Sequence, residues 1–286
     1  MIQRMCQNGQ HRALPSLTEV ISIVEDLRSV LFPGYFGEAE LDLCSMEFHV
    51  GSTLDRVSRN LKDQINRGLC FACTGEEDDQ PQKCEENAAL ITREFLNRLS
   101  KVQHLLETDI RATYMGDPAA PNIDEIIFCY PNILAITNYR LAHELYELGV
   151  PIIPRMITEH AHSITGIDIH PHAEIGESFF IDHGTGVVIG ATSVIGNRVK
   201  IYQGVTLGAK AFTKDEEGKA KKGINRHPIV EDDVVIYSGA TILGRITIGR
   251  GSVIGGNVWL TQSVPEGGRI TQSEIRYEKF IDGGGI

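Results

Sequence analysis

Aliphatic residues recur every six positions through the last third of the chain, and this spacing constrains the fold more than any other feature. Two earlier blocks keep the same spacing, and glycine often follows the aliphatic residue directly. A period of six fits neither an α-helix nor a simple strand alternation. It favours a parallel β-helix of triangular cross-section, whose stacked coils send one aliphatic side chain per face into a continuous core. The fourteen repeat positions are Ile169, Ile175, Ile181, Val187, Ile189, Ile195, Ile201, Leu207, Val230, Ile236, Ile242, Ile248, Ile254 and Leu260.

The composition limits the size and the partners of the chain. Its 286 residues suffice for two compact units with their own cores. The net charge of −11 at pH 7 argues against nucleic acid or an anionic membrane surface as the main partner. The apolar stretches are far shorter than a membrane span, and residues 1–16 lack the charged-then-apolar order of a signal segment. We therefore expect a cytoplasmic protein.

All six cysteines lie in the first half of the chain, and two of them form a Cys-x-x-Cys pair at Cys70 and Cys73. Cys84 follows eleven positions after Cys73, but no histidine or cysteine supplies a fourth zinc ligand at the usual spacing. We therefore predict reduced thiols and no bound metal.

The sequence before the repeats carries the signals of α-helices. Ser16 or Thr18 is suited to cap a first helix, which Pro33-Gly34 would stop. Apolar residues at helical spacing predict the helical segments 20–31, 46–61, 88–106, 123–128 and 132–148.

The chain is thus expected to be an α+β protein with two domains and a tail. Residues 1–155 would form the α-helical domain, and residues 156–264 the β-helix. An excursion from the coil is predicted near residues 209–226, because Leu207 and Val230 are 23 positions apart. Its part 210–222 is charged and lacks aliphatic residues, which favours a functional flap over an idle insertion. Residues 265–286 would form a C-terminal tail.

Six of the ten histidines lie in or just before the repeats. Asp168 precedes His183 by 15 positions, which would put the two side chains on neighbouring turns. An aspartate beside His183 could fix its tautomer and leave a general base suited to neutral pH. Arg226 offers a guanidinium that could bind a carboxylate through two hydrogen bonds. The six histidines are His160, His162, His170, His172, His183 and His227.

Together with the repeats, several short motifs resemble the serine O-acetyltransferases of the left-handed β-helix hexapeptide acyltransferase superfamily. The likeness covers roughly residues 85–264 and is specific as a set. It implies a left-handed β-helix and an acyltransferase that moves the acetyl group of acetyl-CoA to the L-serine hydroxyl. The product would be O-acetyl-L-serine for cysteine biosynthesis. The motifs are Asp117-Pro118, Gly166-Ile-Asp168-Ile-His170-Pro171, Ile181-Asp182-His183-Gly-Thr-Gly186, Val205-Thr-Leu-Gly208, Arg226-His227-Pro228 and Ile242-Leu-Gly244.

The resemblance also implies roles for individual residues. His183 would be the general base, paired with Asp168, and would later protonate the leaving thiolate. Asp117 and Asp182 would hold the serine ammonium, Arg226 would hold its carboxylate, and His227 would also lie at the serine pocket. The coenzyme would run along the coils and contact mainly backbone groups at Gly208, Ala209, Gly239 and Ala240.

The same resemblance implies partners. The serine pocket would lie between adjacent subunits of a homotrimer, so that a monomer would be inactive. The assembly would be this trimer or a dimer of trimers, with the helical domains pairing the trimers in the second case. L-cysteine is expected as a feedback inhibitor because it shares the ammonium and carboxylate of serine. The ending Gly283-Gly-Gly-Ile286 would bind O-acetylserine sulfhydrylase through the Ile286 carboxylate.

Two stretches depart from the family pattern. Residues 209–225 are longer than the short glycine-rich loop of many relatives, and Thr261-Gln-Ser-Val-Pro265 lacks the usual turn. These departures affect the expected contacts to coenzyme A and the inhibition by cysteine more than the reaction.

Three other functions are compatible with a β-helix. A related acyltransferase acting on a sugar or xenobiotic hydroxyl would leave Asp117 and Arg226 without a role. A γ-class carbonic anhydrase would need three histidines around a metal, whereas the histidines here have acidic and basic neighbours. A non-catalytic scaffold would only present the tail to a partner. Release of free thiol from acetyl-CoA on adding L-serine separates these alternatives.

Overall fold

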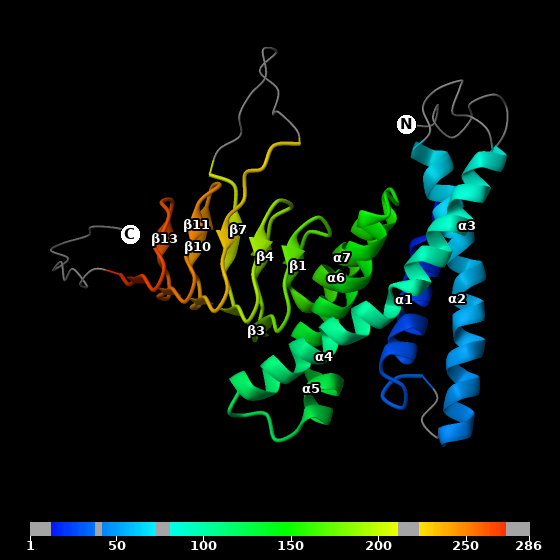
Figure 1. The fold of residues 1–286 in the computed structure, drawn as a ribbon, viewed down its shortest axis with the longest axis horizontal. Coiled ribbons are helices and arrows are strands. Elements are labelled where there is room, and N and C mark those ends of the chain that lie inside the picture. The colour runs from blue at the N-terminus through cyan, green and yellow to red at the C-terminus, as the bar shows by residue number, and fades with distance from the viewer. Residues whose placement is uncertain (1–12, 38–41, 73–80, 211–222, 273–286) are drawn as a thin grey trace, which may run out of the picture.

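The computed structural model describes residues 13–37, 42–72, 81–210 and 223–272. Seven α-helices precede a β-helix, and the helices gather at the end of the β-helix where its first strand lies (Figure 1). This arrangement confirms the predicted α+β class. The acidic stretch 76–79, most of the predicted excursion and the tail with Ile286 lie outside the described residues.

The helices form their own core, as their apolar spacing predicts. Ser16 caps the first helix, since its hydroxyl accepts from the N–H of Glu19. The predicted helix over 88–106 is wrong in one respect, because the chain breaks at Arg98 into two helices. Buried Phe95 and Leu99 continue the apolar spacing through the break, so the pattern could not reveal it. The helices are α1 Leu17–Leu31, α2 Leu43–Ala72, α3 Pro81–Asn97, α4 Leu99–Gly116, α5 Ile123–Cys129, α6 Pro131–Glu147 and α7 Ile153–Thr165.

Helix α7 corrects the predicted boundary between the two domains, because residue 156 lies inside it. Pro154 does not end the helical region. It lies in the first turn of α7, where a missing N–H costs no helical hydrogen bond. Within the described part of the chain, no helix is long and apolar enough to cross a membrane.

Fourteen short strands of the described residues pair in parallel and form three faces. The first face contains β1-β4-β7-β10-β13, the second β2-β5-β8-β11 and the third β3-β6-β9-β12-β14. The strands are β1 Asp168–Ile169, β2 Glu174–Ile175, β3 Phe180–Asp182, β4 Val188–Ile189, β5 Val194–Ile195, β6 Lys200–Tyr202, β7 Thr206–Gly208, β8 Ile229–Val230, β9 Val235–Ile236, β10 Thr241–Leu243, β11 Thr247–Ile248, β12 Val253–Ile254, β13 Trp259–Leu260 and β14 Arg269–Ile270.

The six-residue repeat builds the core of this β-helix. Thirteen of the fourteen repeat positions are buried, and Leu260 is half-buried. The first coil is longer than the 18 residues that three faces of six would give, since Asp168 pairs with Val188, 20 positions later. The next coil has 18, since Val188 pairs with Thr206. The two extra residues lie between β3 and β4, at the corner that carries His183.

Candidate active site

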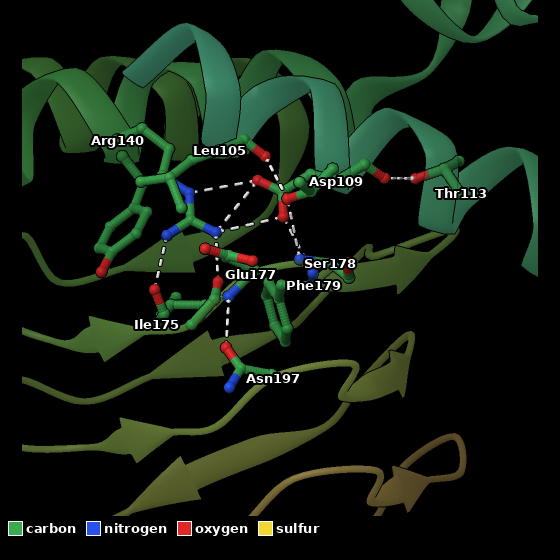
Figure 2. A network of polar contacts seen from close by, with 12 residues as sticks. Leu105, Asp109, Thr113, Arg140, Ile175, Glu177, Ser178, Phe179 and Asn197 are labelled. Atoms are coloured by element: carbon green, nitrogen blue, oxygen red, sulfur yellow. Dashed lines mark hydrogen bonds and ion pairs between the residues drawn. The ribbon is translucent and has the colours of Figure 1, made fainter. Parts of the chain in front are cut away.

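Helix α4 is anchored to the first coil by a buried ion pair (Figure 2). Asp109 of α4 and Arg140 of α6 lie with Oδ2 and Nη2 3.1 Å apart, and both side chains are almost completely buried. Arg140 donates to the carbonyl oxygens of Ile175 and Gly176 at 2.6 Å, and Asp109 accepts from the N–H of Phe179 at 2.9 Å. Burial raises the pKa of Asp109 to about 6, although Arg140 opposes the rise. The network fixes α4 on the coil about two turns before its C-terminal end.

Asp117 is the residue that caps this C-terminal end of α4. Its Oδ1 accepts from the N–H of Ala119 at 2.8 Å, and its Oδ2 accepts from the hydroxyl of Tyr130 at 2.7 Å. The Tyr130 hydroxyl and then the Ala119 N–H lower the pKa of Asp117, and the same contact raises the pKa of Tyr130 to about 12. Asp117 is therefore an ionised carboxylate in a fixed orientation. The sequence carried no signal for Tyr130.

Asp182 and His183 lie at the end of β3 and at the start of the His183 corner, which we define as residues 183–187. The N–H of Gly184 donates to the carbonyl oxygen of Asp182 at 2.7 Å, and His183 has φ 57. The chain thus makes a γ-turn centred on His183, a left-handed conformation that is costly for a residue with a Cβ. The turn leaves the imidazole 74% exposed, with Nε2 3.7 Å from Oδ1 of Asp182.

Asp117 and the His183 corner form one polar group. Lys200 links them, because its Nζ donates to the carbonyl oxygen of Gly116 at 2.8 Å and lies 3.8 Å from Oδ2 of Asp182. The charges of His183 and Lys200 add to the lowering of the pKa of Asp117. The structure therefore brings together Asp117, Asp182 and His183. Lys200 was not predicted, since finding it requires the coil length that pairs it with Phe180.

Asp168 does not pair with His183 in the structure. It starts β1 and lies beside α7, where its Oδ1 is 3.5 Å from Nη1 of Arg155. The ion pair of His183 is with Asp182 instead. The predicted pairing of Asp168 with His183 therefore needs a rearrangement of one of the two side chains, because Arg155 competes for the Asp168 carboxylate.

Asp168 also belongs to a group of potential metal ligands with Glu159 and His162 of α7. One ligand atom of each lies within 4.8 Å of the others. Arg155 contacts both Glu159 and Asp168, so that a guanidinium already balances the two carboxylates. This arrangement favours a salt-bridge network over a cation site.

Arg226 and His227 lie at a second corner, which joins the first face to the second. We call it the His227 corner (residues 190–193 and 223–228). His227 is 7% exposed, and its ring packs on Gly190, where an added Cβ would lie 2.0 Å from Cδ2 of His227. The N–H of Thr192 donates to Nδ1 of His227 at 3.0 Å. The Thr192 hydroxyl accepts from the N–H of Arg226 at 2.9 Å. Only glycine, which has no Cβ, therefore fits at position 190 beneath the His227 ring.

The electrostatics of His227 fix which of its nitrogens carries the proton. Burial, followed by the charges of Arg226 and Arg245, lowers the pKa of His227 to about 4. The ring is therefore neutral at pH 7. Because a backbone N–H can only donate, Nδ1 is the acceptor and Nε2 carries the hydrogen. His227 can thus donate one hydrogen bond from Nε2.

The two corners lie at opposite ends of the first face, since one precedes β4 and the other follows β4 and β7. A face of about six residues spans about 20 Å at full extension. Within one chain, Arg226 and His227 are therefore not grouped with Asp117, Asp182 and His183. The other four predicted histidines also lie away from His183; His172, for example, stacks on Tyr146 at 4.7 Å.

The four predicted coenzyme-binding positions divide between the two ends of the first face. Gly208 ends β7 and Ala209 follows it, at the end of the first face where the His227 corner lies, and Gly239 and Ala240 lie two coils beyond the His183 corner. The N–H groups of Gly239 and Ala240 donate within the coils, to Gln203 at 2.9 Å and Tyr237 at 3.3 Å. These two N–H groups are therefore already satisfied.

A column of glycines continues the His183 corner along the coils. An added Cβ on Gly186 would lie 3.7 Å from the Cα of Gly204, and one on Gly204 would lie 3.4 Å from the Cα of Gly239. All three have positive φ. Gly186 is exposed, whereas Gly204 and Gly239 are half-buried, and an added Cβ on Gly239 would clash with the Asn257 side chain.

Comparisons with known proteins agree with the repeats. The bacterial transferase hexapeptide (six repeats) family matches residues 227–262. The chain is 54% identical over 281 residues to the plasmid serine acetyltransferase of Synechococcus elongatus, covering 98% of this chain and 88% of the relative.

Two crystal structures from Entamoeba histolytica have the same fold. Serine acetyltransferase 1 in complex with L-cysteine is 39% identical, with a TM-score of 0.75, over 87% of this chain and 86% of that chain. Serine acetyltransferase isoform 3 in complex with cysteine is 34% identical, with a TM-score of 0.76, over 98% and 89%. The hexapeptide repeats and these neighbours fit a left-handed β-helix.

Proposed function

This chain belongs to the serine acetyltransferase family, and we propose that it acetylates L-serine at a site combining the His183 corner of one chain with the His227 corner of another. The grouping of Asp117, Asp182 and His183 is the observation that carries the proposal. It joins two carboxylates suited to an ammonium group with an exposed imidazole suited to a hydroxyl proton.

The two carboxylates supply the binding energy for the amino group of serine. Asp117 is kept ionised by Tyr130, and Lys200 links Asp182 to the same helix end. Charge-assisted hydrogen bonds from the substrate ammonium to both would orient the serine hydroxyl toward His183.

His183 would then act as the general base. It would take the hydroxyl proton as the serine oxygen attacks the carbonyl carbon of acetyl-CoA, and a tetrahedral intermediate would form. Collapse of this intermediate breaks the carbon–sulfur bond, and the same proton passes from His183 to the leaving thiolate. The carboxylate nearest to His183 is that of Asp182. Support of the imidazolium by Asp168 stays a prediction, which requires Asp168 to exchange Arg155 for His183.

The second corner would bind the serine carboxylate. Arg226 offers the guanidinium, and the Nε2 hydrogen of His227 offers a second donor. Because these groups lie about one face away from His183 in the same chain, we propose that they come from the adjacent subunit of a homotrimer. Pairing of two trimers through the helical domains is the corresponding proposal for a hexamer.

Acetyl-CoA would lie along the coils beside His183. Gly186 and Gly204 support this position, since they offer an extended ligand a backbone surface without side chains of their own. We place Ala240 at the edge of that surface. Gly208 and Ala209 lie at the opposite end of the first face, away from His183.

L-cysteine would compete with serine because its ammonium and carboxylate fit the same groups. The two solved relatives with cysteine bound support this inhibition. Binding of O-acetylserine sulfhydrylase through Ile286 stays a prediction from the sequence.

Serine-dependent release of free thiol from acetyl-CoA tests the proposal. We expect thiol release with L-serine and none with sugars or without an acceptor. Thiol release that does not depend on L-serine would contradict the assignment, and retained sulfhydrylase binding without turnover would favour a scaffold.

A further inference from the structure

Lys200 lies where the end of α4 meets the third face of the β-helix. In the parallel ladder between β3 and β6, the backbone of Lys200 pairs with that of Phe180. The Nζ lies 4.6 Å from the centre of the Phe180 ring and 4.8 Å from that of Tyr202. It donates to the carbonyl oxygen of Gly116 at 2.8 Å. The side chain is only 22% exposed, so its position is defined by these contacts.

The approach of α4 to the coil is unusually close at this point. An added Cβ on Gly116 would lie 2.7 Å from the Phe180 ring. Gly116 is the last residue of α4, and its carbonyl has no helical partner, so a cation is favourable there. Lys200 thereby holds the residue that directly precedes Asp117.

The same ammonium group also reaches the second carboxylate. Its Nζ is 3.8 Å from Oδ2 of Asp182. Two carboxylates that share one ligand repel each other unless a cation compensates them. Lys200 acts on both carboxylates. It holds the Gly116 carbonyl next to Asp117, and its charge lies close to Asp182.

We propose that Lys200 is a positioning residue, which holds Asp117 and Asp182 at the spacing that binds the amino group of serine. This inference rests on the proposed function, because it concerns the same ammonium site. Lys200 does not touch the reacting atoms, and it acts through the two carboxylates.

A positioning role has a consequence for pH that a packing role lacks. Asp117 faces Tyr130 of the α5–α6 junction, Asp182 and His183 of the coil, and Lys200 of β6. The Tyr130 hydroxyl lowers the pKa of Asp117 most, and the charge of Lys200 adds a smaller lowering. Loss of that charge raises the pKa, so Asp117 is protonated at a higher pH. Serine binding should then be lost at a higher pH on the acid side.

Lys200→Met tests the role, because methionine retains the packing on Phe180 and Tyr202 without the charge. The measurement is the affinity for L-serine between pH 3 and 8 by calorimetry, which does not depend on turnover and includes the range in which Asp117 takes up its proton. We expect a loss of about tenfold at pH 7.5 and a shift of the acid limb to higher pH. Lys200→Arg should recover most of the affinity. Lys62→Met, at an exposed ion pair of α2, is the matched control and should match the wild type.

Two results would overturn the proposal. One is unchanged serine affinity and pH dependence in K200M, and the other is an equal loss of affinity for serine and acetyl-CoA. Lys200→Gln carries the same test if K200M does not fold. A wild type that binds serine without releasing thiol would contradict the proposed function while leaving the Lys200 comparison decisive.

Discussion

Asp182 and His183 contact each other within a single tight turn, with Oδ1 of Asp182 3.7 Å from Nε2 of His183. The carbonyl oxygen of Asp182 closes the same turn by accepting from the N–H of Gly184. The residue proposed to bind the ammonium and the residue proposed to take the proton are thus fixed by one γ-turn. The strain of this turn exposes the imidazole to solvent.

His183→Ala should abolish most of the turnover. Loss of a general base costs about 10²–10⁴-fold in rate, and the effect should fall on kcat because the ammonium and carboxylate ligands of serine remain. Steady-state thiol release measures kcat, and calorimetry should show serine affinity within about threefold of the wild type. A variant that retained full turnover would remove His183 from the role of base.

Tyr130→Phe should weaken serine binding without changing the chemistry. The variant loses only the hydroxyl that donates to Asp117, so the pKa of Asp117 rises and its orientation loosens. We expect the KM for serine to rise about threefold to tenfold at pH 7.5, with the KM for acetyl-CoA unchanged. Tyr114→Phe on the exposed surface of α4 is the control. An unchanged KM in Y130F would show that Asp117 needs no partner.

The repeat predicted the β-helix well because a buried aliphatic is required at each turn of the coil. It also contained a sign of the site. The inward residues Ile181 and Ile189 are eight positions apart instead of six, and the extra residues form the His183 corner. An interruption of a strict repeat is therefore informative, since the coil must place those residues outside its core.

Other features depend on contacts that no short pattern contains. The break between α3 and α4 at Arg98 leaves the apolar spacing unchanged, so the spacing alone predicts one continuous helix. Lys200 and Tyr130 reach Asp117 from segments far along the chain or from a helix junction. Asp168 was predicted from its spacing to His183, but spacing does not reveal the competing Arg155.

His227 should contribute a loss of fold stability on acidification, opposed by Asp109, whose raised pKa acts in the other direction. The pKa of His227 is lowered to about 4 in the folded chain, below the ordinary value of 6.5, so the unfolded chain binds more protons between these pH values. The stabilising effect is present above pH 6.5 and is lost as the pH falls toward 4. Allowing for solvent screening, we expect about 1 kcal/mol lost by pH 5.

Urea unfolding at pH 7.5 and pH 5 measures this loss in the wild type and in His227→Asn. The asparagine Oδ1 can still accept from the N–H of Thr192 but does not titrate. H227N should therefore lose less stability than the wild type over this range. His104→Asn, on the exposed surface of α4, controls for the loss of a histidine elsewhere. Equal pH dependence in H227N and the wild type would contradict the prediction.

Two inactive variants should restore activity to each other when their chains assemble together. His183→Ala damages one corner, and Arg226→Ala damages the other, which lies about one face away in the same chain. If each site takes one corner from each of two neighbouring chains, a trimer of mixed chains contains some sites with both corners intact. Unfolding the two variants together in equal amounts and refolding them should recover about a quarter of the wild-type sites. Thiol release from acetyl-CoA with L-serine measures the recovery.

Asp182→Asn mixed with His183→Ala is the matched control, because both changes lie at the same corner and no mixed site is intact. Failure of the first pair to recover activity would mean that one chain supplies both corners.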